Sequence, residues 1–222
     1  MEDAKDRRIR QLEQLVQERT AQLEQWYDDT VEALGSALEL KDAETRDHCQ
    51  SVTAFCISIA KSMPVPDTYL PILARAAFLH DIGKMAIPDR LLYKPGPLTD
   101  DEKHVMRKHC EIGYNMLIRI PFLRKAAEIV LAHQEFFDGT GYPRGLEGEE
   151  IPLGARILAV ADALDVMISD QRYRRALPLS HAREEILQFS GTQFDPKVVE
   201  VFFSLPESLW VELRNKVRAG TV

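Results

Sequence analysis

The sequence predicts an all-α fold, in which a helical bundle follows an N-terminal helix that resembles a coiled-coil stalk. Apolar residues recur at helical spacing through most of the 222 residues. Helix-start signals occur along the chain, among them the capping box of Thr99 and Glu102 and the Asp195-Pro196 pair. No stretch alternates convincingly between apolar and polar residues, so little or no sheet is expected.

The first 34 residues contain neither Gly nor Pro and predict a helical stalk. Their apolar residues follow alternating steps of three and four, the pattern of a heptad seam, at Ile9, Leu12, Val16, Leu23 and Trp26, with Arg19 and Thr30 interrupting it. Two interpretations stay open. The stalk pairs with a second copy of the chain to form a homodimer, or it is a single amphipathic helix that lies on the bundle. A stalk at this position also suggests a sensor or receiver domain upstream in a longer protein.

Residues 35–222 are expected to form one helical domain. Its predicted helices cover about residues 67–79 with Asp67 as N-cap, 99–119, 122–133, a long stretch from Pro152 to about 169, and a stretch that opens at Pro196. The segment 138–154, DGTGYPRGLEGEEIPLG, interrupts this pattern and holds five of the eleven glycines. A Gly/Pro loop of this length inside a helical domain is more often functional than not.

Composition excludes several classes of protein. The formal net charge of −7 argues against a broad basic surface for a nucleic-acid polymer, although metal ions could still attract a small anionic substrate. Three cysteines without CxxC spacing argue against a disulfide framework and a zinc finger, and they are expected to be small buried hydrophobes. No apolar run approaches the roughly 20 residues of a membrane helix. A cytoplasmic location, with no membrane segment in this chain, is therefore expected.

The sharpest chemical signal is the His80-Asp81 pair, which follows the apolar run ILARAAFL. Burying both side chains without partners would be costly, and a metal ion removes that cost because imidazole and carboxylate are natural ligands for Fe, Mn or Zn. On the dipeptide alone, an Asp that caps a turn beside a His bonded to backbone explains the pattern equally well. Glu44 and His48 are four residues apart and share a helix face, but such a pair is often only a surface contact.

Three further residues lie where a buried metal centre needs ligands. His133 ends the apolar helix AAEIVLA much as His80 ends its own, and Asp162 lies inside the apolar run ILAVADALDVM, where a carboxylate needs a strong partner. His104 and His109 are five residues apart, so at most one of them can face the centre, and the apolar neighbours favour His109. We assign no function to His181.

Taken together, these residues resemble the HD-GYP family, a subgroup of the HD-domain metal phosphohydrolases. The resemblance covers about residues 30–205, and its motifs occur in the family's order with compatible spacing. The matching elements are ETRDH (44–48), HDIGK (80–84), IPDRLLYKPGPLT (87–99), MRKHCEIG (106–113), HQEFFDGTGYP (133–143), IPLGARILAVAD (151–162) and YR (173–174).

The resemblance implies a helical HD-domain bundle that holds two, in some members three, iron or manganese ions. It implies hydrolysis of cyclic di-GMP to the linear dinucleotide pGpG, in some members on to GMP. The residues that match the family's metal ligands are His48, His80, Asp81, His109, His133 and Asp162, with Glu44 matching a ligand of the three-metal arrangement.

The resemblance also implies roles toward the substrate. Asp81 is the expected bridge between two ions, because a carboxylate can span them. Lys84 is expected to neutralise charge on the phosphate, and Arg174 to hold the second phosphate. The residues that match the signature loop are Gly141, Tyr142 and Pro143.

The chain departs from the family pattern at two positions. Many members have a second histidine where this chain has Gln134, and an amide is a weaker ligand for these metals. Gln171 replaces the usual Arg of an Arg-Pro-Tyr sequence, although Arg172 could reach the same phosphate. Beside an active cyclic di-GMP phosphodiesterase, two alternatives therefore stay open: a degenerate member that binds the nucleotide or a partner protein without turnover, and a hydrolase of a mixed cyclic dinucleotide.

Overall fold

The computed structural model describes residues 2–41, 45–170 and 175–221. Within those ranges the regular structure is entirely helical, and pairing between extended segments is limited to two isolated bridges, Asp138 with Glu147 and Ser190 with Phe194. The predicted all-α class is confirmed. None of the helices in these ranges combines the length and the apolar character that crossing a bilayer requires.

The α-helices in chain order are α1 (Glu2–Lys41), α2 (Thr45–Lys61), α3 (Leu70–Leu79), α4 (Asp89–Leu92), α5 (Asp100–Arg107), α6 (His109–Leu117), α7 (Arg124–Ala132), α8 (Leu153–Ile168), α9 (Leu179–Gln188), α10 (Pro196–Ser204) and α11 (Glu207–Arg218). Short 3₁₀ segments connect some of them: η1 (Asp67–Tyr69), η2 (Ile82–Ala86), η3 (Pro121–Leu123) and η4 (Gly148–Glu150).

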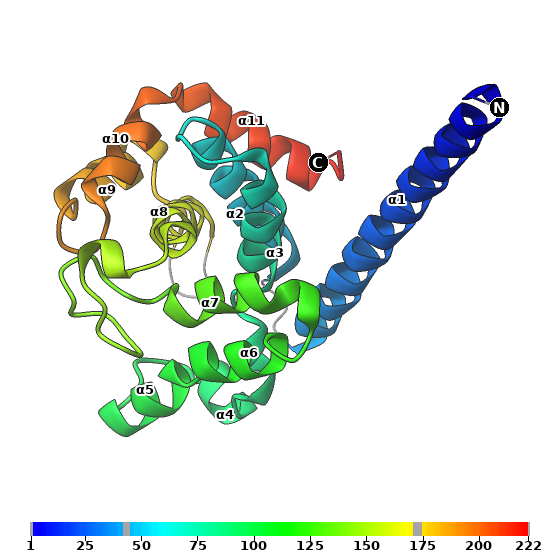
Figure 1. Cartoon of the computed structure of the whole chain (residues 1–222). Coiled ribbons are helices and arrows are strands. Elements are labelled where there is room, and N and C mark those ends of the chain that lie inside the picture. Colours follow the sequence, from blue (N-terminus) through cyan, green and yellow to red (C-terminus); the bar gives the residue numbers. More distant parts are fainter. Residues whose placement is uncertain (1, 42–44, 171–174, 222) are drawn as a thin grey trace.

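The bundle is organised around α8, which Figure 1 shows nearly end-on at its centre. Helix α2 packs against both α3 and α8, α3 also packs against α7, and α9 and α10 close the bundle over α8. The core consists of side chains that these helices bury completely or almost so, including Phe55, Ile59, Leu73, Val130, Ile157, Leu164, Phe202 and Trp210. All three cysteines are buried, as expected, and no disulfide joins them.

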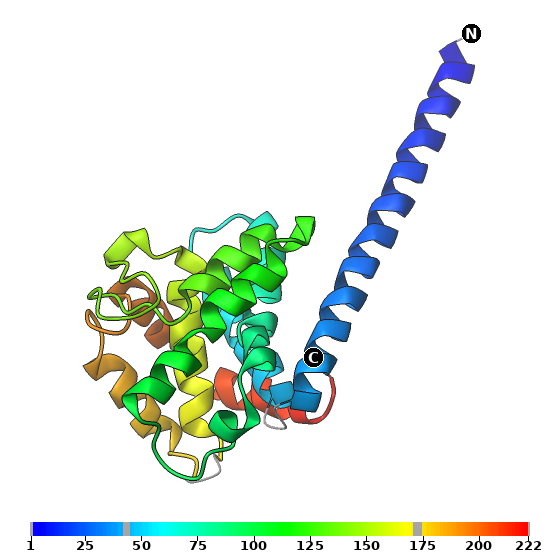
Figure 2. The same cartoon turned by 90° about the horizontal axis from the view of Figure 1, so that it is seen from below.

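Helix α1 leaves the bundle as a rod, as Figures 1 and 2 both show. Only its C-terminal part is anchored: Val31 and Leu38 are buried, and the Tyr27 ring stacks on Phe122 at 4.1 Å between centroids. The seam residues from Ile9 to Trp26 are 44–63% exposed. The interpretation that the seam lies on the bundle is therefore wrong. The helix runs through residue 34 without a break, so the division at that residue stays a prediction.

Helix starts agree with the sequence in part. The capping box at Thr99 forms, and Asp195 accepts a hydrogen bond from the backbone N–H of Lys197 at 2.8 Å. The predicted helix over 99–119 is instead two helices that meet at Lys108, because the chain turns there to direct α6 into the bundle while α5 stays at its surface. The expected Asp67 cap is wrong: Pro66 occupies the N-cap position of η1.

A close backbone contact joins η2 to α6. A Cβ atom at Gly83 would lie 1.9 Å from the carbonyl oxygen of His109 and 2.7 Å from the backbone nitrogen of Gly113, so only glycine fits. This contact fixes the spacing between Asp81, which precedes η2, and His109, which begins α6.

We predict that Gly83→Ala forces η2 and α6 apart and lowers the free energy of unfolding by about 1–3 kcal/mol. Thermal denaturation followed by circular dichroism should show a Tm lower by several degrees. Ala86→Gly, an exposed change in the same 3₁₀ segment, serves as the control and should cost about 1 kcal/mol or less. Equal Tm values for Gly83→Ala and the wild type would mean that the two elements are not held this tightly.

Candidate metal centre

Six of the predicted ligands converge at one place in the bundle, and most of them lie at helix ends. His80 and His133 are the C-cap residues of α3 and α7, and Asp81 is the N-cap residue of η2. His109 is the first residue of α6. Helices α2 and α8 contribute His48 and Asp162 from their interiors. The apolar faces of these helices pack in the core, and the packing thereby brings the polar residues together.

The first group of ligand atoms comes from His48, His80 and Asp162, and these atoms all lie within 4.8 Å of one another. His48 Nε2 is 3.3 Å and His80 Nε2 is 3.9 Å from Oδ1 of Asp162. The Asp162 side chain is 23% exposed, whereas His80 is almost completely buried. Oδ1 of the partly exposed Asp162 therefore lies near the Nε2 atoms of both His48 and His80.

The second group consists of His109, His133 and Cys110. The two Nε2 atoms of the histidines are 3.2 Å apart, and Cys110 Sγ lies 3.5 Å from His109 Nε2. Sequence reasoning missed the position of Cys110 at the centre. Burial raises the pKa of its thiol above the usual range, so the sulfur is a protonated neighbour of the histidines.

Asp81 lies between the two groups. Its Oδ2 is 3.4 Å from His80 Nε2, and its Oδ1 is 3.7 Å from His109 Nε2. Lys84, one turn later, donates to Oδ2 at 2.7 Å. A single buried carboxylate therefore faces a histidine of each group, and its role as a bridging ligand stays a prediction.

Backbone hydrogen bonds fix the tautomer of three histidines. The Nδ1 atoms of His80, His109 and His133 lie 2.7–2.8 Å from the carbonyl oxygens of Ala77, Met106 and Val130, each three residues earlier. A carbonyl can only accept, so each Nδ1 carries a proton, and Nε2 is the nitrogen of each ring that is left to bind a metal ion.

The charges in the centre favour a bound cation. Burial lowers the pKa of His133 to about 3 and also lowers that of His109, so both imidazoles are neutral near pH 7. Burial alone would raise the pKa of Asp81, but the positive charge of Lys84 opposes it most strongly, and the pKa lies well below the usual range. The Nε2 atoms of His109 and His133 thus face each other as two acceptors beside an ionised carboxylate. A metal ion fits this set of donors, because it accepts both lone pairs and balances the charge.

His48 is held by a second carboxylate that sequence reasoning missed. Its Nδ1 donates to Oδ2 of the buried Asp165 at 2.8 Å, which directs Nε2 toward Asp162. Burial alone would lower the pKa of His48, but Asp162 and Asp165 outweigh it and raise the pKa to about 10. The same negative potential favours a metal ion at Nε2. The sequence offered one indication of this role: Asp162 and Asp165 are three residues apart, which puts both on one face of α8.

The signature loop folds back beside the centre. Glu135 is buried and its carboxylate accepts backbone N–H bonds from Arg144 at 2.7 Å and Leu146 at 3.1 Å. A Cβ atom at Gly141 would lie 2.1 Å from the backbone nitrogen of Phe136, so the loop needs glycine there. Tyr142 packs its ring 6.5 Å from that of His109, between centroids. These contacts place the loop against α6 and next to the ligands.

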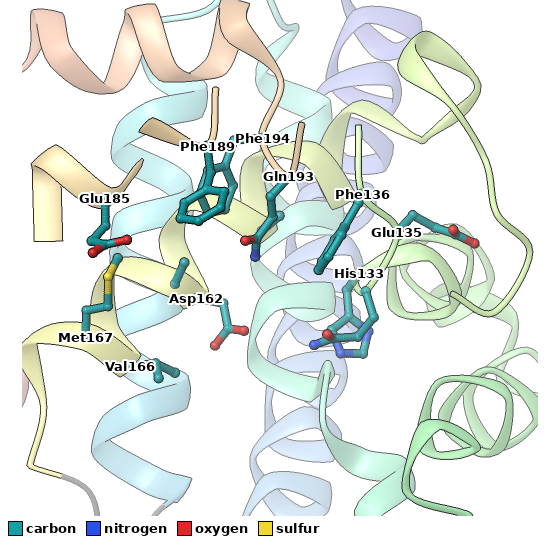
Figure 3. A pocket seen from close by; sticks show the side chains of 13 residues that line it. His133, Glu135, Phe136, Asp162, Val166, Met167, Glu185, Phe189, Gln193 and Phe194 are labelled. Atoms are coloured by element: carbon teal, nitrogen blue, oxygen red, sulfur yellow. The ribbon is translucent and has the colours of Figure 1, made fainter. Parts of the chain in front are cut away.

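A cavity of about 320 Å³ opens beside His133 and Asp162 (Figure 3). Gln134, the departure from the family pattern, lines it, so the position where many members have a second histidine borders open space. The Glu135 carboxylate points away from the cavity toward the loop that it binds.

Some predicted residues do not enter this centre. His104 and His181 are exposed, as the sequence suggested for His104. Glu44, Gln171, Arg172 and Arg174 lie outside the described residues.

Comparisons with known proteins show the family of this chain. The model of the HD domain family matches residues 10–198. This chain belongs to the HD-domain family. Its motifs resemble those of the HD-GYP group.

A cyclic di-GMP phosphodiesterase of Thermotoga maritima is 40% identical over 200 residues, which are 89% of this chain and 54% of that protein. A probable cyclic di-GMP phosphodiesterase of Vibrio cholerae is 36% identical over 221 residues, covering 92% of this chain and 50% of the relative. The chain thus spans about half the length of these relatives. The crystal structure of V-cGAP3, a cyclic GMP-AMP specific phosphodiesterase of V. cholerae, shares the fold with a TM-score of 0.66 at 21% identity. The match covers 85% of this chain and 52% of that one.

We predict that Asp165→Ala weakens metal binding about 10–100-fold, because His48 loses the acceptor that orients it. Competition for Mn²⁺ against a fluorescent chelator measures the affinity. Asp165→Asn, whose side-chain oxygen can still accept from Nδ1, should recover part of the loss. His104→Ala is the matched control for removing a polar group away from the centre. Wild-type affinity in Asp165→Ala would show that the aspartate does not position His48.

Proposed function

We propose that this chain is a metal-dependent phosphodiesterase domain that hydrolyses cyclic di-GMP to the linear dinucleotide pGpG, and that it is the output domain of a signalling protein. The position of Asp81 between two groups of histidines is the observation that carries the proposal. The relatives named as cyclic di-GMP phosphodiesterases support the choice of substrate.

We assign the metal ligands in two sets that share Asp81. One ion would be held by His48, His80 and Asp162, and the other by His109 and His133. Iron and manganese suit these nitrogen and oxygen donors. We propose Glu44 as a ligand of a third ion and Gln134 as a position that leaves room for water. When bound, a pair of such ions supplies Lewis acidity and an activated water for displacement at phosphorus.

The protein's own groups position the phosphodiester. Lys84 is 25% exposed at the side-chain level, and its ammonium lies against Asp81, so it brings a positive charge to the edge of the ligand set where a phosphate oxygen would bind. We assign Arg172 and Arg174 to the second phosphate of the cyclic dinucleotide. The loop with Gly141 and Tyr142 closes the site on the side of α6. A cytoplasmic location and an upstream sensor or receiver domain fit this role.

The activity test uses protein prepared without oxygen and loaded with Fe²⁺ or Mn²⁺. Chromatography of the products from cyclic di-GMP should show pGpG or GMP from the wild type and none from Asp81→Ala. Lys84→Ala should reduce turnover about 10²-fold, as expected for the loss of one charge-stabilising donor. Lys103→Ala, which removes an exposed lysine paired with Asp100, should not change turnover.

Binding of cyclic di-GMP without turnover under either metal would contradict an enzyme and favour a degenerate nucleotide-binding module. Reversion of Gln134 to His and of Gln171 to Arg would then be the next variants. Turnover of mixed cyclic GMP-AMP in preference to cyclic di-GMP would change the substrate and keep the reaction.

We also propose that the stalk pairs two copies of the chain. Apolar residues of its seam, among them Ile9, Leu12 and Val16, are exposed on a helix that projects away from the bundle (Figure 2). A surface of this kind is covered in a coiled-coil dimer.

We predict that Leu23→Asp, which buries a charge in the seam of the dimer, gives monomers by light scattering where the wild type gives dimers. Glu24→Gln is the matched control on the neighbouring position outside the seam. A Leu23→Asp protein that remains dimeric would place the contact elsewhere.

A further inference from the structure

The cavity beside the metal centre extends beyond the ligands into a region that displacement at phosphorus does not require. His133 and Asp162 lie at one side of it, and α9 with the turn after it forms the other side (Figure 3). Its volume of about 320 Å³ falls in the range of sites for small molecules. A group attached to the reacting phosphate could therefore enter it.

Aromatic rings line this region. Phe136 follows the ligand helix α7, while Phe189 and Phe194 flank the turn after α9. Phe194 is buried with 3% exposure and supports the wall, whereas Phe189 is 40% exposed. An exposed phenylalanine at the wall of a cavity offers a ring face for stacking, and nucleobases are commonly held by such stacking.

The polar side chains of the cavity are available to a ligand. Glu185, Gln193 and Gln134 line it, and no hydrogen bond or ion pair engages their side chains in the part of the chain that the structure describes. Figure 3 shows Glu185 beside Met167, on the side of the cavity away from His133. One carboxylate and two amides thus surround an aromatic space.

We propose that this region is a guanine subsite, in which Phe189 stacks on the base and Glu185 accepts hydrogen bonds from its N1–H and N2–H₂ groups. The inference rests on the proposed function and names residues that select the base. Guanine presents two adjacent donors on this edge, which match a carboxylate. Adenine presents the N1 acceptor there, which a carboxylate repels. Gln193 and Gln134 can donate to O6 or to the ribose.

The subsite is tied to the signature loop through the backbone. The N–H groups of Phe137 and Asp138 donate to the carbonyl oxygens of Gln193 at 3.2 Å and Thr192 at 2.9 Å. The backbone N–H of Phe194 donates to Phe189 at 3.1 Å, which closes the turn. The wall that carries Phe189 and Gln193 is therefore fixed relative to the residues that follow His133.

The test compares two variants with matched controls. Glu185→Gln is compared with Glu184→Gln, which changes the neighbouring exposed glutamate in the same way. Phe189→Leu is compared with Leu187→Ala, which changes an exposed apolar residue of α9 outside the cavity. Each Mn²⁺-loaded variant is assayed with cyclic di-GMP, cyclic di-AMP and bis(p-nitrophenyl) phosphate, which has no base. Binding of cyclic di-GMP to the metal-free proteins is measured by calorimetry.

The proposal predicts that Glu185→Gln raises KM for cyclic di-GMP and weakens its binding about tenfold, because one charge-assisted pair of hydrogen bonds is lost. The same variant should lower the ratio of kcat/KM for cyclic di-GMP to kcat/KM for cyclic di-AMP. It should leave the hydrolysis of bis(p-nitrophenyl) phosphate unchanged. Phe189→Leu should weaken the binding of both cyclic dinucleotides by a similar factor. The two control variants should behave as the wild type.

Equal KM and binding for Glu185→Gln and Glu184→Gln would overturn the subsite, whatever the wild-type activity. So would a loss of bis(p-nitrophenyl) phosphate hydrolysis that parallels the loss of cyclic di-GMP hydrolysis, because it would locate the damage at the metal centre. A wild type that hydrolyses none of the three substrates contradicts the proposed function, and the calorimetric comparison then tests the subsite by itself. Absent binding, or equal binding in Glu185→Gln and the wild type, overturns the subsite. A tenfold loss of binding that is confined to Glu185→Gln and absent from Glu184→Gln supports it.

Discussion

The buried carboxylate of Asp81 is the constraint on which the rest of the centre depends. It is ionised, it lies between a histidine of each ligand group, and Lys84 is the cation that contacts it among the described residues. Imidazoles surround it whose Nδ1 atoms are bound to backbone carbonyls, which leaves Nε2 of each ring to bind a metal ion. Such an arrangement is unfavourable when dry and without a cation, and it becomes favourable when a metal ion neutralises the carboxylate and accepts the lone pairs.

The fold supplies these ligands by ending helices where they are needed. Apolar helices such as α3 and α7 bury their faces in the core, and the first polar residue after each is a ligand, His80 or His133. The backbone carbonyl three residues before each histidine then orients the ring without any further side chain. The contact at Gly83 sets the distance between η2 and α6, so that the carboxylate and His109 meet. Stability of the bundle and geometry of the centre therefore come from the same packing.

Much of this was predictable because it depends on local patterns. The all-helical class follows from apolar spacing, and the burial of His109 instead of His104 follows from the residues around each. The break at Lys108 was not predictable, since both helices share one continuous pattern and only the packing of α6 ends the first. Asp165 and Cys110 were missed because their roles depend on neighbours distant in sequence. The same holds for the cavity, whose wall comes from α9 and the turn after it, a region without a recognisable motif.

The most direct test of the central claim is anomalous X-ray diffraction from crystals of the Mn²⁺-loaded protein, collected on both sides of the manganese absorption edge. The account predicts anomalous peaks on both sides of Asp81, one within bonding distance of His48, His80 and Asp162 and the other of His109 and His133. A peak at only one of these positions, or metal bound away from Asp81, would contradict a centre in which this carboxylate joins two ligand sets.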